Sequence, residues 1–471
     1  MFRRRLLIFI AVVALLVGIG FGGWRTLSAK KKPYRPNTIL MTLDTTRMDY
    51  LSCYGYPARI TPVIDKLAEE GLKYEFAISP SSWTLPAHAS IFTGMLPSYH
   101  SAHYGKGENA EKGVLGGPSF YTLHPAFPTL TECLKEAGYL TKAIVSGPVL
   151  QEKFGFGQGF DHYDDDFPAG MEHRVGDDTT DLAIGYLTAY VRGLQQQPFF
   201  LFLNYFDPHN PFSAPAPWGT PDLNPDLVNI ASGHYDDVYK GNRVLTAEER
   251  ELLLKEYVNE IRFMDHQIGR LFSYLKDCDL YDDAFIVITS DHGECFGEHD
   301  HLEHGHSLNE ELLRVPLIIK YPAKHRRSGV VKERVSTAGV MSTILDYLNL
   351  PAPPGVKFAS FDTGGHELAA EIFEDLNFVQ KYGERYSRNQ KAVYDGTFKF
   401  IWSSDGKHEL YNISNDPLEV VNLYGRMPDL EKRLQAKLDP LIYESNRMTS
   451  LTTPELDEEL RGRLRALGYI Q

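Results

Sequence analysis

Residues 284–290 (AFIVITS) form an apolar run that ends abruptly at Asp291, His292, Gly293 and Glu294. Such a run, closed by polar residues, predicts a buried strand in a sheet covered on both faces. A carboxylate and an imidazole at the end of that strand each cost several kcal/mol of desolvation if they stay unpaired. Because a metal ion would remove this cost, the sequence places the expected chemistry at Asp291 and His292.

A second strand ends in the same way far upstream. Residues 38–43 (TILMTL) run directly into Asp44, Thr45, Thr46 and Arg47. In open α/β sheets, ligand sites collect beyond the carboxyl ends of the strands. We therefore expect Asp44 to meet Asp291 and His292 in space despite their separation along the chain.

Apolar strand-like runs alternate with helix-period segments through most of the chain. The runs are 38–43, 140–145, 199–206, 284–290 and 315–321. The segments with helical spacing are 64–70, 129–137, 179–194 and 248–275. This alternation predicts an α/β fold with a mostly parallel sheet sandwiched by helices.

The pattern shifts to shorter elements from about residue 356. Residues 392–395 and 399–402 read as a hairpin around Gly396, residues 410–413 as another strand, and residues 430–438 as a helical tail. We interpret this part as a small antiparallel α+β subdomain. The expected organisation is an amino-terminal anchor or signal with a linker (1–36), a catalytic domain (37–355) and a carboxyl-terminal subdomain with its tail (356–471).

The amino terminus predicts attachment to a membrane. Residues 6–23 are uncharged and mostly apolar and follow Arg3, Arg4 and Arg5; as a helix they would span about 27 Å, enough to cross a bilayer. A cleaved signal peptide is the alternative, but residues 27–29 make a poor cleavage site. We expect an uncleaved anchor with the catalytic domain outside the cytoplasm. The formal net charge of -14 argues against a nucleic-acid partner.

Residues 81–94 (SSWTLPAHASIFTG) have the pattern of a helix start, with Pro86 in the first turn. A hydroxyl at Thr84 would face free backbone amides and the positive end of the helix dipole, which favour an alkoxide and a bound anion. Thr84 is therefore a candidate nucleophile. The alternative is that Thr84 only caps the helix.

Seven ordered segments resemble the sulfatases and their alkaline-phosphatase-like relatives. They are LDTTR (43–47), TPVIDKLAEEGLKYEFA (61–77), TLPAHASIFTG (84–94), FDPHNPF (206–212), SDHGE (290–294), HGHSLNEELLRVPLIIKYP (304–322) and HELYNISNDPLEVVNL (408–423). The resemblance implies an alkaline-phosphatase-like fold and a hydrolase with one divalent metal ion. It also implies that Asp44, Thr84, Asp291 and His292 hold this ion. Oxygen ligands with one imidazole suit Ca, Mg, Mn or Zn without choosing among them.

The sequence departs from sulfatases at the nucleophile. Sulfatases carry a Cys or Ser in a CxPxR-like motif, which is oxidised to formylglycine, whereas this chain has Thr84, Pro86 and His88 at the matching positions. A threonine cannot form that aldehyde, and His88 stands in place of the arginine as an expected substrate-binding residue. Phosphoryl chemistry is therefore at least as favoured as sulfuryl chemistry. The expected substrate is a small-molecule, glycan or lipid ester.

Four more residues complete the predicted site. His209 follows the strand at 199–206 and resembles the family's substrate-contacting histidine. His304 is the candidate general acid, because imidazole titrates near neutral pH, and His306 competes for this role. Arg47 would pair with Asp44 or with an oxyanion of the substrate.

Three alternatives remain open on the sequence alone. The first is a two-metal site, in which Asp207, His209 and His304 would bind a second ion. The spacing of these residues along the chain does not match that of two-metal relatives. The chain would otherwise be a membrane-anchored transferase of phosphoryl head groups, as the anchor and Thr84 both allow. A catalytically silent module that binds a sulfated or phosphorylated glycan is the third possibility, against which the retained acidic and imidazole ligands argue.

Overall fold

The structure is a computed structural model that describes residues 35–105, 120–167, 171–194, 196–220, 235–364, 367–444 and 456–467. Residues Pro36–Gln471 form one compact unit. The predicted anchor at 6–23 lies outside the described residues. Within the described ranges, no helix has both the length and the apolar character required to span a bilayer.

An eight-stranded sheet forms the centre of the compact unit, in the order β12-β2-β11-β7-β1-β6-β4-β5. Its strands are β1 (Thr38–Leu43), β2 (Leu72–Tyr74), β4 (Leu140–Ile144), β5 (His162–Asp164), β6 (Phe199–Tyr205), β7 (Phe285–Thr289), β11 (Leu317–Lys320) and β12 (Gly329–Val331). The five strands from β7 to β5 are parallel to one another. This confirms the predicted mostly parallel sheet.

The strand expected at residues 315–321 differs in extent and direction. Pro316 cannot donate to a ladder, and the chain divides there into β10 (Arg314–Val315), which pairs with β3 (Ala77–Ile78), and β11. Strand β11 runs antiparallel to β7. A parallel neighbour would need a helical crossover, and the only α-helix in the fully described segment between them is the four-residue α11 (Glu310–Leu313).

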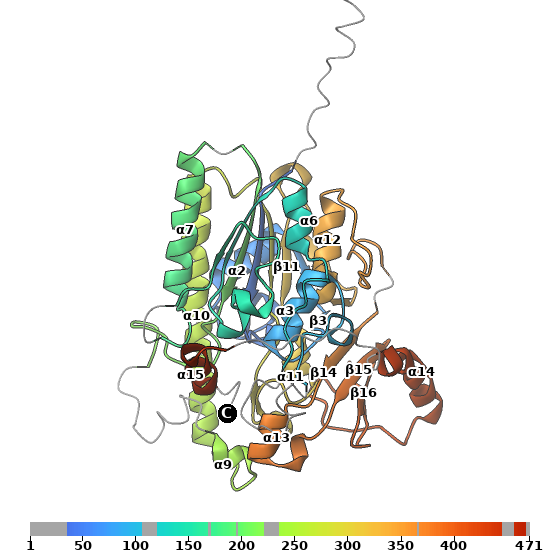
Figure 1. The fold of residues 1–471 in the computed structure, drawn as a ribbon. Helices are drawn as coiled ribbons and strands as arrows, with labels where there is room; N and C mark the ends of the chain where they lie inside the picture. Colours follow the sequence, from blue (N-terminus) through green and yellow to red (C-terminus); the bar gives the residue numbers. More distant parts are fainter. Residues whose placement is uncertain are drawn as a thin grey trace, which may run out of the picture. The chain divides into compact units, whose positions relative to one another are not determined.

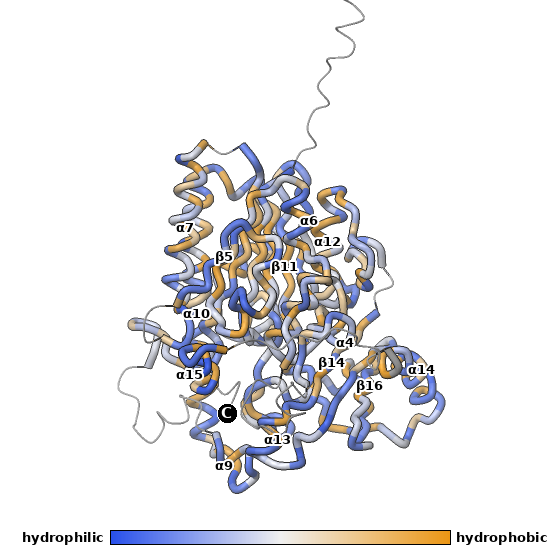
Figure 2. Tube along the Cα trace, in the orientation of Figure 1, coloured by the Kyte–Doolittle hydropathy of each residue, from blue (hydrophilic) through white to orange (hydrophobic). Residues whose placement is uncertain are grey.

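Helices cover both faces of this sheet because successive strand residues point to opposite sides. Ile39 and Met41 pack in the core with α2 (Pro62–Glu70), α7 (Gly176–Arg192) and α10 (Ala247–Asp277). Leu40 packs in the other core with α3 (Thr84–Thr93), α6 (Leu130–Glu136) and α12 (Val340–Tyr347). Figure 1 shows α7 and α10 on one side and α6 and α12 on the other. Figure 2 shows hydrophobic residues concentrated along the strands between them.

The carboxyl-terminal part builds its own antiparallel sheet, in the order β14 (Ala369–Ile372), β15 (Gln390–Asp395), β16 (Phe398–Ser403) and β17 (Glu409–Asn412). The predicted hairpin is β15 and β16, and Gly396 supplies the positive φ of 59° at its turn. Helix α14 (Pro428–Glu444) packs Leu434 and Leu438 against this sheet. The antiparallel subdomain is therefore confirmed, while the boundary at residue 355 stays a prediction.

Candidate metal centre and active site

The structure brings Asp44, Asp291 and His292 together at the carboxyl ends of two adjacent strands. Asp44 follows β1, and Asp291 and His292 follow its neighbour β7. The three ligand atoms lie within 4.8 Å of one another, and all three side chains are fully buried. Asp291 Oδ2 is 3.3 Å from His292 Nε2.

The chemistry of this cluster fits a divalent cation. Asp44 Oδ1 and Asp291 Oδ2 are buried without a hydrogen-bond partner in the described part of the chain. Burial, followed by the nearby Asp291 carboxylate, holds the pKa of Asp44 well above its usual value, and burial also raises the pKa of Asp291. His292 donates from Nδ1 to the carbonyl of Gly293 at 2.9 Å, which leaves Nε2 as an acceptor facing the carboxylates. Two buried carboxylates and an imidazole nitrogen that carries no proton form a site that a positive charge would complete.

Thr84 opens helix α3 beside this cluster. Trp83 is the N-cap residue and no side chain caps the helix, so the alternative that Thr84 is a capping residue is wrong. The Thr84 hydroxyl instead lies 3.1 Å from His292 Nε2. It therefore sits at both the positive end of α3 and the edge of the metal-type cluster.

His88 lies one turn further along α3 and is fully buried. Its Nδ1 donates to the carbonyl of Thr84 at 2.8 Å, and its Nε2 accepts from the hydroxyl of Thr42 at 2.9 Å. Because both ring nitrogens are used inside the protein, the substrate-binding role predicted for His88 is corrected to a positioning role. It ties the Thr84 turn to strand β1.

Arg47 is also held by the protein. Its guanidinium pairs with Asp49 at 2.8 Å and with Glu298 at 3.0 Å, and it donates to the carbonyl of Glu294 at 3.1 Å. Neither Asp44 nor an open substrate surface takes part in these contacts, so the two roles predicted for Arg47 are corrected. Arg47 joins the loop after β1 to the loop after β7, where the proposed ligands are located.

Two predicted histidines do lie together at the cluster. The ring of His304 is 4.4 Å from that of His292 and 4.9 Å from that of His209. Burial lowers the pKa of His304, but the Glu294 carboxylate at 3.2 Å more than offsets it, and the net pKa is raised. Burial holds the pKa of His209 well below its usual value. His304 is thus the more readily protonated of the two rings.

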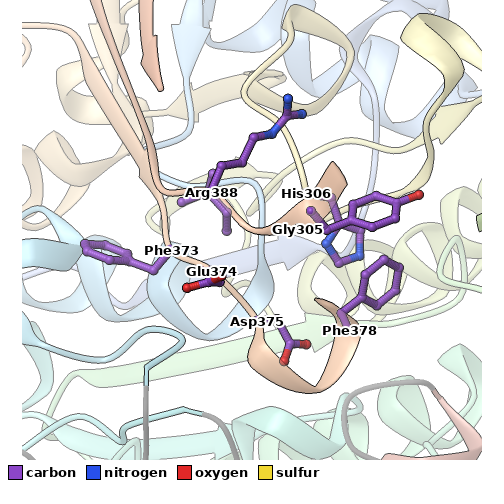
Figure 3. Close-up of a pocket in the computed structure, with 9 residues that line it drawn as sticks. Gly305, His306, Phe373, Glu374, Asp375, Phe378 and Arg388 are labelled. Atoms are coloured by element: carbon purple, nitrogen blue, oxygen red, sulfur yellow. The ribbon is translucent and has the colours of Figure 1, made fainter. Parts of the chain in front are cut away.

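His306 lies in a different environment from His304. Its ring stacks on Phe378 at 3.7 Å, and it lines a pocket with Phe373, Glu374 and Arg388, as Figure 3 shows. Burial holds the pKa of His306 well below its usual value, so this imidazole is a poor acid at neutral pH. His304 therefore lies beside the cluster, whereas His306 lies against Phe378.

Asn204 is a site residue that the sequence reasoning missed. It lies near the end of β6 and donates to Asp44 Oδ2 at 3.2 Å and to the hydroxyl of Thr42 at 3.3 Å. The side-chain oxygen of Asn204, Oδ1, accepts from the backbone amide of Gly147 at 3.0 Å. The available signal was a single amide side chain inside the apolar run FFLFLNY.

The alternative two-metal site is not assembled. Asp207 accepts from the Gly176 amide at 2.8 Å, and burial raises its pKa to about 7. In the described residues, the groups with metal-type spacing are Asp44, Asp291 and His292, and a separate set of His299, Glu311 and Glu419. Asp207 belongs to neither group. His299 is half-buried against Glu311.

Comparison with known proteins identifies two matching families. The sequence profile of the Sulfatase family matches residues 36–350, and that of the carboxyl-terminal part of N-sulphoglucosamine sulphohydrolase matches residues 297–444. These ranges cover the central sheet, the cluster and the small antiparallel sheet.

Individual relatives span nearly the whole chain. The multifunctional alkaline phosphatase superfamily protein PehA of Trinickia caryophylli is 27% identical, over 83% of this chain and 91% of that protein. The N-acetylglucosamine-6-O-sulfatase of Bacteroides thetaiotaomicron is 24% identical, over 91% and 89%. The phosphonate monoester hydrolase of Agrobacterium radiobacter has the same fold, with a TM-score of 0.64, 21% identity and coverage of 88% and 96%. The chain belongs to the sulfatase family and is an ester hydrolase.

Proposed function

We propose that this chain is a metal-dependent hydrolase of sulfate or phosphate-type esters with Thr84 at the nucleophile position. The observation that carries the proposal is the Thr84 hydroxyl, 3.1 Å from His292 Nε2 at the amino end of α3. The names of its relatives cover both ester classes, a sugar O-sulfate and a phosphonate monoester. We propose a small molecule or glycan ester as the substrate.

A divalent cation held by Asp44, Asp291 and His292 would lower the pKa of a nearby hydroxyl and neutralise charge on the ester oxygens. The remaining work falls to the chain's own side chains. Asn204 and the Thr45 amide orient the two carboxylates through bonds of 3.2 Å each. His88 holds the Thr84 turn, and the raised pKa of His304 keeps a proton available for the departing oxygen.

Threonine limits how the reaction can finish. The deprotonated Thr84 oxygen would form a bond to sulfur or phosphorus while the ester oxygen leaves with its electron pair and takes the proton of His304. The resulting threonine ester has no second geminal hydroxyl through which to expel the anion. Water must attack this ester directly. A threonine nucleophile therefore gives sulfate esters no advantage over phosphate-type esters as substrates.

A substrate panel tests the proposal. Aryl sulfate, phosphodiester and phosphonate monoester would each be assayed with Ca, Mg, Mn and Zn, for the native chain and for D291N. We expect metal-dependent turnover of at least one ester, lost in D291N. Full turnover by D291N would refute it, as would an inactive but metal-loaded native chain that binds sulfated glycan. Transfer of the phosphoryl group to a lipid alcohol without hydrolysis would favour the transferase.

We also propose that residues 6–23 hold the full chain at a membrane with the catalytic unit outside the cytoplasm. The length and apolar character of this stretch support the proposal. Carbonate extraction of membranes from cells that produce the full chain should leave it in the pellet, and protease added on the outer side of the membrane that holds it should digest it. Release of the chain by carbonate, or its protection from protease, would overturn the proposal.

A further inference from the structure

A second histidine–carboxylate cluster lies outside the active site. His299 comes from the short 3-10 helix Glu298–Asp300, Glu311 from α11, and Glu419 from the segment after β17. Their ligand atoms lie within 4.8 Å of one another. Glu311 is 7% exposed and Glu419 is 1% exposed, so water solvates neither carboxylate freely.

His299 and Glu311 face each other in this cluster, and the Glu419 carboxylate also accepts from the Asn309 side chain and the Glu310 amide. His299 Nε2 and Glu311 Oε2 are 3.4 Å apart, yet neither has a hydrogen-bond partner among the described residues. Two ligands of a tetrahedral ion with bonds of about 2.1 Å are separated by about 3.4 Å. The same spacing, 3.3 Å, separates Asp291 Oδ2 from His292 Nε2 in the first cluster.

Acidic side chains outnumber lysine around the cluster. Glu310, Glu311 and Glu419 are three buried carboxyl groups, and Lys399 lies 3.0 Å from Glu310 and 2.8 Å from Glu419. A carboxylate has enough lone pairs to keep its lysine partner and still bind an ion. A divalent cation would balance negative charge that Lys399 leaves and that is otherwise costly to bury.

We propose that His299, Glu311 and Glu419 bind a zinc ion that is separate from the catalytic centre. One imidazole and two carboxylates suit zinc better than calcium or magnesium, which prefer oxygen ligands alone. The side chain of His299 is 20% exposed, which gives the ion access and leaves room for a water molecule as fourth ligand.

The position of this site indicates a structural role. The carbonyl of Leu312, next to Glu311, accepts from the amide of Gly293 at 2.8 Å, and Gly293 directly follows the proposed catalytic ligands. A Cβ on Gly293 would lie 1.9 Å from the carbonyl oxygen of Glu311, so the two segments are in close backbone contact. Zinc would therefore connect the catalytic loop and α11 to the carboxyl-terminal sheet through Glu419.

Metal content tests the site independently of activity. The full chain would be loaded with Zn²⁺, passed through gel filtration and analysed by mass spectrometry for zinc per chain. In the variant D44N/D291N, which removes the carboxylates of the first cluster, we expect about one zinc per chain. Adding H299A/E311Q should reduce this to none, whereas adding H266A, at an exposed histidine, should not change it.

Thermal unfolding provides the second readout, with H299A alone as the milder variant if H299A/E311Q does not fold. A chelator should lower the Tm of D44N/D291N by several degrees and should leave the Tm of D44N/D291N/H299A unchanged. A folded D44N/D291N without zinc would overturn the proposal and indicate a protonated His299 paired with Glu311. Zinc retained after H299A would overturn it as well.

Discussion

The role proposed for Thr84 depends on its position more than on its residue type. A threonine hydroxyl is a weak nucleophile at neutral pH, and burial alone would disfavour its ionised form. The amino end of α3 and a cation in the adjacent cluster would favour that form. The β-methyl group of Thr84 also restricts rotation about χ1, which helps to hold the oxygen towards His292.

Substitution of Thr84 should separate its chemical role from its packing role. T84A should lower kcat by at least about a thousandfold, because no other hydroxyl takes its place, and T84S should retain a substantial fraction of activity. Steady-state kinetics and the content of the activating metal would be measured for each variant. Activity of T84A within about tenfold of the native chain would show that water attacks the ester directly.

His304 and His306 can be distinguished by the leaving group. Nitrophenolate leaves without protonation, whereas an alkyl alkoxide needs a proton from an acid. H304A should therefore slow hydrolysis of alkyl esters by about 100-fold or more, and that of nitrophenyl esters much less. H306A is the matched control and should affect both substrates equally. A larger selective loss in H306A would contradict the assignment.

The role of a residue could be predicted from the sequence where the course of the backbone alone brings that residue to the site. Asp44, Asp291 and His292 end adjacent parallel strands, so their meeting follows from the sheet. The partners of Arg47 and His88 depended on side chains distant in sequence. Glu298 captures Arg47, and Thr42 captures His88, so neither residue is left to face a substrate.

At the scale of elements, helix α2 is capped by another helix. Its N-cap residue Thr61 makes no side-chain capping bond. Asp265 on α10 instead accepts from the amides of Val63 at 3.1 Å and Ile64 at 2.9 Å. Asp265 therefore has a structural role at the start of α2.

Removal of this carboxylate should loosen α2. D265A leaves two amides without acceptors in a buried setting and should lower the free energy of unfolding by about 1–3 kcal/mol. Urea unfolding of D265A and of H266A, its exposed neighbour, would measure the difference. An equal effect of the two substitutions would contradict the capping role.

The same carboxyl group predicts a pH dependence. Burial raises the pKa of Asp265 from 3.8 to about 7. The folded chain therefore holds the proton more tightly than the unfolded chain, and this contribution to stability is lost as pH rises towards about 7. Relative to D265N, the native chain should lose about 1–3 kcal/mol between about pH 5 and pH 7. A difference that stays constant over this range would contradict the raised pKa.

At the scale of the whole molecule, a buried ion pair connects the carboxyl-terminal sheet to a short helix that follows α3. Glu371 on β14 pairs with Lys391 on β15 and accepts from the Ser98 amide at 2.7 Å, and both charged side chains are buried. Ser98 belongs to the short helix α4 (Pro97–His100), which follows α3. The pair therefore holds the carboxyl-terminal sheet to the segment that follows α3.

Breaking this pair should destabilise the whole unit. K391M leaves Glu371 buried and unpaired and should cost about 3–5 kcal/mol of unfolding free energy. E371Q/K391M should recover most of this loss, because glutamine is neutral and still accepts from Ser98. Chemical unfolding would measure both variants. A double variant that is less stable than K391M would contradict this account.

The sequence by itself determined the α/β architecture, the two strand ends that carry Asp44, Asp291 and His292, and the small antiparallel sheet with Gly396 at its hairpin. These features depend on local periodicity and turn chemistry, which each segment carries within itself. Tertiary structure alone decided the direction of β11, the different surroundings of His304 and His306, and the capture of Arg47 and His88. Those outcomes depend on which side chains from distant segments share one buried volume, because burial and neighbouring charge set hydrogen-bond partners and proton affinities.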